Sequence, residues 1–557
     1  MFVTAMSPLL VYASGPFPLT RVSLSMASAR QTDPSPEPPR VQEAPSVVAA
    51  VDMGASAIRL VVAEANAAHE PRVIEEATRG VLLGKDTFSH GKLDAATMEA
   101  TLKALEGFRR IMDTYGVVHY RAVATSAVRE AENCDTFIDR IRLRTGLEVE
   151  VIDGSEENRL TYVAVRSALA GHEALVEGDA LLVGVGGGSG DISFLRKGEP
   201  IHSGIYALGS VRLRQSLSSY HGSHEQKVRL LRRQIHNVVE DIRREMPLRE
   251  ARHFIALGTH LRFAAERISG ETHSTAHGLE IPKAPFLAFC DQIMADDTER
   301  LVERERLPQA EAETLVPALL ACRELLVETA AEKIVVPEAS LCGGLLLELT
   351  RVEQGHGIED FRRQVLASAS ALGEKYRYDV SHARNVAHLA MRLFDQMRPE
   401  HGLSDRHRLL LEVAALLHDV GIYVNLKGHH KHAEYLLSVS EVFGLSREDM
   451  TIVACVARYH RRATPQKSHL TYMSLDRDTR VGVNKLASIL RLANALDADH
   501  LQKIKDVRLS FEEGTWVVEA EGAGDLTMER LASLSRSDLL TEVFGRRIAF
   551  REGPGRI

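Results

Sequence analysis

Two short glycine-containing turns hold the residue types best suited to binding a phosphate group. The first, at residues 52–56, follows a β-branched run and contains Gly54, Ala55 and Ser56. The second, Gly186-Gly187-Gly188-Ser189, follows the apolar run at 180–183. Consecutive backbone N–H groups form an anion-binding nest, and glycine lets the anion approach closely. One such run also occurs in plain flexible turns, but two of them behind buried strands predict a duplicated fold with a phosphate cleft between its halves.

Carboxylates near these turns suit a metal ion and a base. Asp52 precedes the first turn and is positioned to hold Mg²⁺ through water, because a hard cation prefers carboxylate oxygen. Ser155-Glu156-Glu157 marks the start of a helix, with Ser155 expected as its N-cap. Either the two glutamates only complement the helix dipole, or one of them faces the cleft and activates water. Phosphoanhydride hydrolysis also needs cations, and Arg129 is a candidate, although arginines are common on plain surfaces.

Histidines gather in a second part of the chain. Eleven of the 24 histidines lie between His382 and His500, including the adjacent pair His418-Asp419. Imidazole and carboxylate both bind divalent transition metals, and adjacent ligands can grip an ion that lies beside a helix. The residues therefore allow two interpretations, a metal site or a helical domain whose histidines serve other purposes.

Basic segments interrupt an otherwise acidic sequence. Lys427 begins one of them, and Arg458, His460, Arg461 and Arg462 belong to another. Long polyanions need several cationic contacts, each weak and sensitive to salt. We expect these side chains to line a polyanion channel leading toward the glycine turns, although charge runs are also typical of plain solvated faces.

The pattern of elements divides the chain into several domains. Strands and helices alternate to about residue 350, which predicts an α/β fold divided at 46–175 and 176–350. Residues 360–505 read as nearly all helical, and 506–557 return to strand-like pieces with one helix between them. Eight of the 19 prolines fall in residues 1–45, so we expect a disordered tail there. A secretory signal is a rival interpretation of the first 19 residues, and translation starting near Met26 is another.

Composition bounds the class of protein. The net charge of −8 disfavours a nucleic-acid binder, so an anion site must be local. The five cysteines are scattered and lack CxxC spacing, which fits a reducing compartment and excludes a disulfide scaffold. No apolar run is long enough for a transmembrane helix. These features predict a cytoplasmic protein without a membrane partner.

Taken in order, five motifs of the α/β region resemble the exopolyphosphatase / guanosine pentaphosphatase family. They are Val51-Asp52-Met53-Gly54, Thr125-Ser126-Ala127-Val128-Arg129, Ile152-Asp153-Gly154-Ser155-Glu156-Glu157-Asn158-Arg159-Leu160, Gly186-Gly187-Gly188-Ser189 and Ala207-Leu208-Gly209-Ser210-Val211-Arg212-Leu213. The resemblance implies duplicated actin-like (ribonuclease H-like) subdomains and commonly a homodimer. It implies removal of terminal phosphate from polyphosphate, or of the 5′-phosphate from guanosine pentaphosphate, with Mg²⁺ or Mn²⁺. Glu157 would be the catalytic glutamate, Arg129 would contact phosphate, and the two turns would bind phosphate and metal.

This sequence departs from the family pattern at the second turn. Gly184 stands where the family usually has aspartate, and Asp191 stands where it has glutamate. Ala55-Ser56-Ala57 replaces the usual Ser-Asn-Ser of the first turn. A site with fewer oxygen ligands binds Mg²⁺ weakly, repositions it or loses it. A slow enzyme and a non-catalytic polyphosphate or guanosine-phosphate sensor therefore remain alternatives.

The helical region resembles an HD phosphohydrolase domain. Its metal form implies a second divalent ion held by His382, His418, Asp419 and a final aspartate, which appears here as Asn494. Neutral asparagine is a poorer ligand. In the longer exopolyphosphatases a helical domain of this kind is a wall of the substrate cleft. The helical region is therefore either such a wall or a phosphohydrolase in its own right, followed by a small α/β C-terminal domain.

Overall fold

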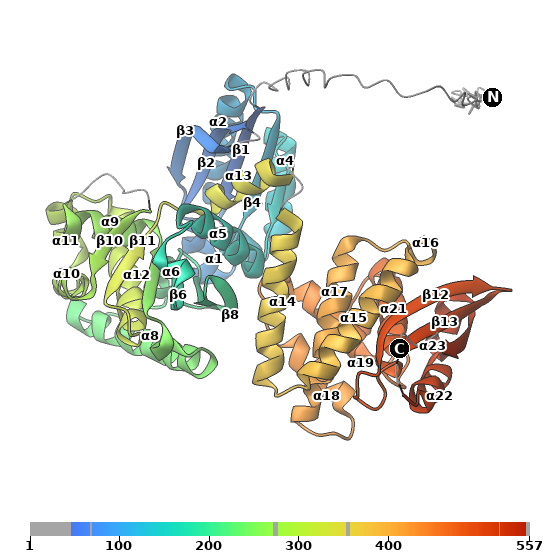
Figure 1. The fold of residues 1–557 in the computed structure, drawn as a ribbon. Coiled ribbons are helices and arrows are strands. Elements are labelled where there is room, and N and C mark those ends of the chain that lie inside the picture. Colours follow the sequence, from blue (N-terminus) through green and yellow to red (C-terminus); the bar gives the residue numbers. More distant parts are fainter. Residues whose placement is uncertain (1–45, 67–68, 271–276, 353–356, 523, 553–557) are drawn as a thin grey trace, which may run out of the picture. The chain divides into compact units, whose positions relative to one another are not determined.

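The computed structural model describes residues 46–66, 69–270, 277–352, 357–522 and 524–552. The tail expected at 1–45 lies outside these residues. The chain divides into a unit of residues 1–44 and a compact unit from Pro45 to Ile557, and only the second is discussed. Figure 1 shows its helices and strands along the sequence.

The first α/β part is built on a five-stranded sheet in the order β3-β2-β1-β4-β5. Its strands are β1 (Ser46–Met53), β2 (Ala57–Asn66), β3 (His69–Gly80), β4 (His119–Ala124) and β5 (Val149–Val151). Its helices are α1 (Leu83–His90), α2 (Ala95–Thr114), α3 (Ser126–Arg129), α4 (Cys134–Thr145), α5 (Gly154–Ala168) and α6 (Glu173–Val176). Strands β1 and β2 form an antiparallel hairpin, and β4 runs parallel to β1. The first glycine turn is thus the bend of this hairpin.

The second α/β part repeats this topology in a six-stranded sheet, in the order β10-β11-β9-β6-β7-β8. Its strands are β6 (Asp179–Val185), β7 (Gly190–Arg196), β8 (Glu199–Tyr206), β9 (His253–Leu257), β10 (Leu279–Pro282) and β11 (Lys333–Val336). Its helices are α7 (Ser210–Gln215), α8 (His224–Glu245), α9 (Thr259–Ser269), α10 (Lys283–Ala295), α11 (Thr298–Glu305) and α12 (Gln309–Val327), with a short 3₁₀ turn at Leu248–Glu250. Strands β6 and β7 form a hairpin, and β9 runs parallel to β6. The expected duplication of the actin-like fold is therefore confirmed.

Helix α5 lies between the two sheets. Leu160 packs with Val48 and Ala50 of the first sheet, whereas Tyr162 packs with Leu182 of the second. Helix α13 (Leu341–Val352) lies close to α5, and a Cβ on Gly344 would come 2.1 Å from the carbonyl oxygen of Leu160. Glycine is required at this close approach. Apolar packing on both sides therefore fixes the position of α5.

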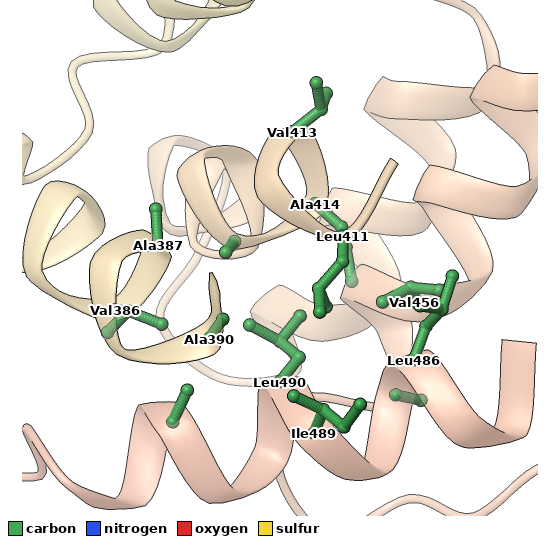
Figure 2. Close-up of a cluster of buried hydrophobic side chains, with 14 of the residues drawn as sticks. Val386, Ala387, Ala390, Leu411, Val413, Ala414, Val456, Leu486, Ile489 and Leu490 are labelled. Carbon is green, nitrogen blue, oxygen red and sulfur yellow. The ribbon is translucent and has the colours of Figure 1, made fainter. Parts of the chain in front are cut away.

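The region from 357 to 495 is helical, as the sequence predicted. It contains α14 (Gly357–Lys375), α15 (Val380–Gln396), α16 (Arg398–His401), α17 (Asp405–Leu417), a 3₁₀ turn at Val420–Tyr423, α18 (His429–Ser438), α19 (Arg447–Arg458), α20 (Leu470–Met473) and α21 (Arg477–Ala495). Figure 2 shows apolar side chains of α15, α17, α19 and α21 pointing toward one another in the core. The long histidine-bearing helices are held together by this core.

The C-terminal part differs from the expectation in one respect. Strands β12 (Ile504–Glu512) and β13 (Thr515–Gly522) form a hairpin with no helix between them. Helices α22 (Thr527–Arg536) and α23 (Asp538–Phe544) follow, and β14 (Arg547–Glu552) then pairs parallel to β13. The expected single helix between the strands is wrong, because a parallel third strand needs a crossover connection and a hairpin does not. Trp516 of β13 belongs to the same buried cluster as the helical region.

The sequence predicted free cysteines and no transmembrane helix. All five cysteines are free thiols, and four of them are buried. Among the helices of the described residues, none combines the length and apolar character needed to cross a bilayer.

Candidate active site

The two glycine turns lie against each other. A Cβ placed on Gly187 would lie 2.8 Å from Ser56 Oγ and 2.9 Å from the Cβ of Ala55. On Gly188 it would lie 2.0 Å from the Oγ of Ser126, at the start of α3. The bends of the two hairpins, which are far apart in sequence, therefore face each other across a narrow gap.

Both turns present unused backbone donors. Within the described residues, the N–H groups of Ala55, Ser56, Gly187, Gly188 and Ser189 donate to no oxygen atom. Such groups at adjacent positions form a concavity with positive potential. The arrangement suits an anion with several oxygens, such as a phosphate group.

The second turn is held from behind by α7. The N–H groups of Val211 and Arg212 donate to the carbonyl of Gly187 at 2.9 and 3.1 Å. Arg212 Nε donates to the carbonyl of Gly188 at 2.7 Å, and its guanidinium pairs with Glu130 of the first α/β part at 2.6 Å. This arginine thus ties the second turn to the first α/β part.

Helix α5 begins earlier than expected. Its N-cap is Asp153, whose side chain accepts from the N–H of Glu156 at 2.9 Å. Ser155 was expected in that role, but it is already helical. Aspartate and serine both cap helices, and the sequence offered both within three residues.

Two adjacent glutamates of α5 have different surroundings. Glu156 pairs with Arg159 and Arg121, at 2.7 and 3.1 Å, and these partners lower its pKa despite its burial. Glu157 Oε2 is buried without a hydrogen-bond partner. Its pKa is raised well above its usual value, first by burial and then by the charges of Asp191 and Asp52. Glu156 therefore belongs to an ion-pair network, whereas Glu157 is available for chemistry.

Three buried carboxylates lie close enough to interact electrostatically. Asp52, Glu157 and Asp191 each have a buried oxygen with no hydrogen-bond partner. Burial raises the pKa of Asp52 to about 6 against the charge of Arg59, and it raises that of Asp191 to about 7. Unpartnered buried carboxylate oxygens are costly. Carboxylate oxygens of this kind are the ligand type that a hard divalent cation prefers.

Two arginines bring positive charge to these carboxylates. Arg129 Nη1 donates to the carbonyl of Ile152 at 2.6 Å, and its charge opposes the raised pKa values of Glu157 and Asp191. Arg59 lies opposite Asp52 in the β1–β2 register and donates to Thr259 Oγ1 at 2.8 Å. Sequence reasoning missed Arg59. The alternation of the hairpin would have placed it on the same face as Asp52.

Gly184 leaves room beside this group. It pairs with Asp191 across β6 and β7, and a Cβ at this position meets nothing nearer than the carbonyl of Asp191 at 3.7 Å. Apart from Asp191, no side chain of the described residues comes within 4 Å of a Cβ at position 184.

The histidine cluster lies in the core of the helical region. His382 and His418 are 1% and 0% exposed, and both place Nε2 near Asp419 Oδ2, at 3.9 and 3.6 Å. Asn494 points elsewhere and donates weakly to the carbonyl of His460 at 3.5 Å. His429 and His460 also face Asp419, although no sequence signal distinguishes them from neighbouring histidines. The proposed ligands His382, His418 and Asp419 remain a prediction.

The structure reduces the expected polyanion channel. His460 is fully buried, and Arg458 pairs with Glu434 inside the helical region. The side chain of Arg458 is 14% exposed. Burial therefore limits the contact that His460 and Arg458 make with a polymer, and their part in the channel stays a prediction. Lys427, Arg461 and Arg462 are exposed, and their part in a channel stays a prediction.

Comparisons with known proteins cover both regions. Residues 61–353 match the model of the Ppx/GppA phosphatase family, and residues 365–542 match that of Ppx/GppA phosphatase, domain III. Exopolyphosphatase 1 of Mycobacterium bovis is 28% identical over 48% of this chain and 78% of its own length. The guanosine-5′-triphosphate,3′-diphosphate pyrophosphatase of Vibrio atlanticus is 24% identical over 81% of this chain and 86% of its own.

A solved structure supports the fold. An exopolyphosphatase from Cytophaga hutchinsonii superposes with a TM-score of 0.50 and 22% identity, covering 55% of this chain and 98% of that one. An exopolyphosphatase-like protein superposes equally well, with 20% identity, over 56% of this chain and 99% of its own.

Proposed function

The chain belongs to the Ppx/GppA phosphatase family, and from this premise we propose that it is a phosphoanhydride hydrolase. Its substrates are inorganic polyphosphate, from which it releases terminal phosphate, or guanosine pentaphosphate, from which it removes the 5′-phosphate. The single observation that carries this proposal is the unpaired, buried Glu157 beside two facing turns with free N–H groups. We place the reaction in the cytoplasm and in a homodimer.

The two turns bind and orient the terminal phosphate. The N–H groups of residues 55–56 and 187–189 donate to its oxygens. Asp52 and Asp191 would hold a divalent cation, Mg²⁺ or Mn²⁺, which supplies positive charge that offsets the phosphate oxygens. Arg129 adds a further positive charge near the same group.

Glu157 accepts a proton from the attacking water. The water oxygen bonds to the terminal phosphorus, the bridging P–O bond breaks, and the shortened chain leaves with the bridging oxygen. Burial and two neighbouring carboxylates raise the pKa of Glu157, which makes it a stronger base than an exposed glutamate. Arg129 opposes this shift.

Gly184 motivates one alternative function. Because Gly184 supplies no carboxylate, only Asp52 and Asp191 are left to hold the cation. If that weaker site loses the cation, the protein binds polyphosphate without cleaving it and is a regulator, not an enzyme. The purified full chain distinguishes the two. With Mg²⁺ or Mn²⁺, phosphate release from long-chain polyphosphate or guanosine pentaphosphate supports hydrolysis. Binding of either compound without any release would replace the hydrolase with the regulator.

A further inference from the structure

A cavity of about 670 Å³ lies between strand β3 and helix α2 of the first α/β part. Glu75 and Arg79 of β3 form one side of it, and Ala100, Ala104 and Gly107 of α2 belong to the other. In the described part of the chain β3 is the edge strand of its sheet, so no strand lies beyond it under the helix. The volume is in the range of small-molecule sites. No residue of the two glycine turns lines this cavity.

Small residues of α2 keep the cavity open. Leu102 and Leu105 of the helix are buried in the core of the first α/β part, while Ala104 and Gly107 line the cavity. A Cβ placed on Gly107 would meet no atom within 4 Å, and the φ of this residue is not positive. Glycine weakens a helix relative to alanine, and neither packing nor backbone conformation requires it here. A larger side chain at this position would extend into the cavity.

Three cationic side chains border the cavity without a carboxylate partner. They are Arg79, Lys103 and Arg110, and within the described residues none of them forms an ion pair, whereas the neighbouring Arg109 pairs with Asp113 at 3.0 Å. Lys103 and Arg110 are two helical turns apart on one face of α2, about 10 Å along its axis. Unpaired cations of this kind bind phosphate or carboxylate groups. The cavity therefore favours a ligand with a negative charge.

A hydrogen-bond acceptor lies toward the other end of the cavity. Tyr115, which follows α2, donates its hydroxyl to Glu75 Oε2 at 2.9 Å. This bond is the main cause of the raised pKa of Tyr115, so the hydroxyl keeps its proton. Among the described residues nothing donates to Glu75 Oε1. Arg79 is four residues farther along β3, about 13 Å away. A ligand in the cavity therefore meets a cation at one end and a carboxylate at the other.

An extended peptide is the other occupant that an edge strand admits. The sequence of β3 disfavours it. Pro71 lies within the strand, and the pairing with β2 shifts register between Val62 and Ala63 and again between Glu64 and Asn66. Proline, bulges and charged side chains are the features by which edge strands resist pairing with another chain. A small molecule is therefore the better occupant.

We propose that this cavity binds a nucleoside phosphate whose base carries N–H donors on its outer edge. Its phosphate lies between Arg79 and Lys103, its flat ring lies against Ala104 and Gly107, and the donors of its base bond to Glu75. Alanine and glycine admit a ring at close range, because neither has a side chain longer than a methyl group. A nucleoside phosphate presents a charge, an apolar ring and N–H donors in the same order as the cavity presents their partners.

Binding is tested by calorimetric titration of guanosine 5′-monophosphate into the full chain without divalent metal. Gly107→Leu fills the cavity and should weaken binding at least tenfold, with an unchanged or higher melting temperature because leucine favours helix. Arg109→Ala, which removes a cation of the same helix from outside the cavity, should leave the affinity unchanged. The double variant Arg79→Ala, Lys103→Ala should weaken binding at least tenfold. Equal affinity in the wild type and Gly107→Leu would overturn the site.

Two further ligands test the base and the phosphate. Adenosine 5′-monophosphate has an acceptor nitrogen beside its amino group, whereas guanine has two adjacent donors. The wild type should therefore bind the guanosine compound severalfold more tightly, and Glu75→Gln should reduce this preference. Inorganic phosphate that binds as tightly as either nucleotide would overturn the nucleoside part and leave a plain anion site. Absence of nucleotide binding, with a polyglutamate peptide that binds the wild type but not Gly107→Leu, would replace the nucleotide with an acidic peptide.

Discussion

At the scale of single residues, the account depends on the difference between two adjacent glutamates. Glu156 is neutralised by Arg159 and Arg121, while Glu157 is buried beside two repelling carboxylates, with the charge of Arg129 opposing them. The sequence placed both in the first turn of one helix but could not separate them without the family resemblance. Their hydrogen-bond partners come from other elements, so the distinction is visible only in the fold.

The buried carboxylates Asp52, Glu157 and Asp191 predict a pH-dependent effect of metal on stability. An acid whose pKa is raised in the folded state holds its proton more tightly there than in the unfolded chain. The free energy of unfolding of the metal-free protein therefore falls as pH rises. The contribution of Asp52 is lost between about pH 4 and about pH 6, and that of Asp191 between about pH 4 and about pH 7. Mg²⁺ compensates the ionised carboxylates, so it should raise the melting temperature more at pH 8 than at pH 5.5.

The control for this effect is the double variant Asp52→Asn, Asp191→Asn. It should be more stable than the wild type at pH 8 without metal, and Mg²⁺ should change its melting temperature equally at both pH values. A wild type that gains the same number of degrees at pH 5.5 and pH 8 would show that these carboxylates do not bind the ion.

Gly184 predicts a gain of metal affinity by substitution. The position has ordinary van der Waals space for a Cβ beside Asp191, and its φ is not positive. Gly184→Asp should restore a third aspartate near the ion and lower the Mg²⁺ concentration that gives half-maximal phosphate release by about tenfold. Gly184→Asn, of the same size but uncharged, should give a smaller change. An unchanged Mg²⁺ dependence in Gly184→Asp would contradict the placement of the ion beside β6 and β7.

At the scale of elements, hairpin bends and helix starts position the site. The β-branched run at 47–51 and the apolar run at 180–183 predicted strands β1 and β6, and the glycine turns after them predicted the bends, because these signals are local in sequence. That Gly187 lies against Ser56 was a hypothesis based only on the predicted duplication of the fold. The sequence predictions for the N-cap of α5 and for the helix of the C-terminal part were wrong. In both places several nearby residues carry competing sequence signals, and packing decides between them.

Gly209 predicts how firmly the second turn is placed. A Cβ there would lie 2.2 Å from the carbonyl carbon of Gly188 and 2.5 Å from the nitrogen of Ser189, so backbone atoms of the turn would have to move. Gly209→Ala should reduce kcat/KM for polyphosphate by at least tenfold with the fold retained. Gly184→Ala, which meets no atom nearer than 3.7 Å, is the matched control and should be nearly silent. Equal kinetics in both variants would show that the exact position of the turn does not matter.

At the scale of the whole molecule, the helical and C-terminal parts share one core. Trp516 of β13 and Leu411 of α17 belong to the same buried cluster and are 3% and 0% exposed. The sequence suggested a separate small domain after residue 505, because local patterns reveal elements but not which cores they join. The family model for domain III likewise runs through residue 542.

The shared core predicts cooperative unfolding of these two parts. Trp516 is the only tryptophan, so its fluorescence reports the C-terminal sheet. Leu411→Ala, a substitution in α17, should destabilise this cluster by about 2–5 kcal/mol and shift the Trp516 transition to lower urea concentration. Leu534→Ala, on an exposed position of α22, is the control and should shift it little. A Trp516 transition that ignores Leu411→Ala would indicate two independent cores.

The most direct test of the whole account compares the two adjacent glutamates. Phosphate release from long-chain polyphosphate and from guanosine pentaphosphate is measured with Mg²⁺ for the wild type, Glu157→Gln and Glu156→Gln. The account predicts that Glu157→Gln lowers kcat by roughly 10²–10⁴-fold with unchanged or higher melting temperature, because it removes the base and a buried charge. Glu156→Gln should lower the melting temperature and leave kcat within a few-fold of the wild type. Full turnover by Glu157→Gln would contradict the central claim that this residue activates the water.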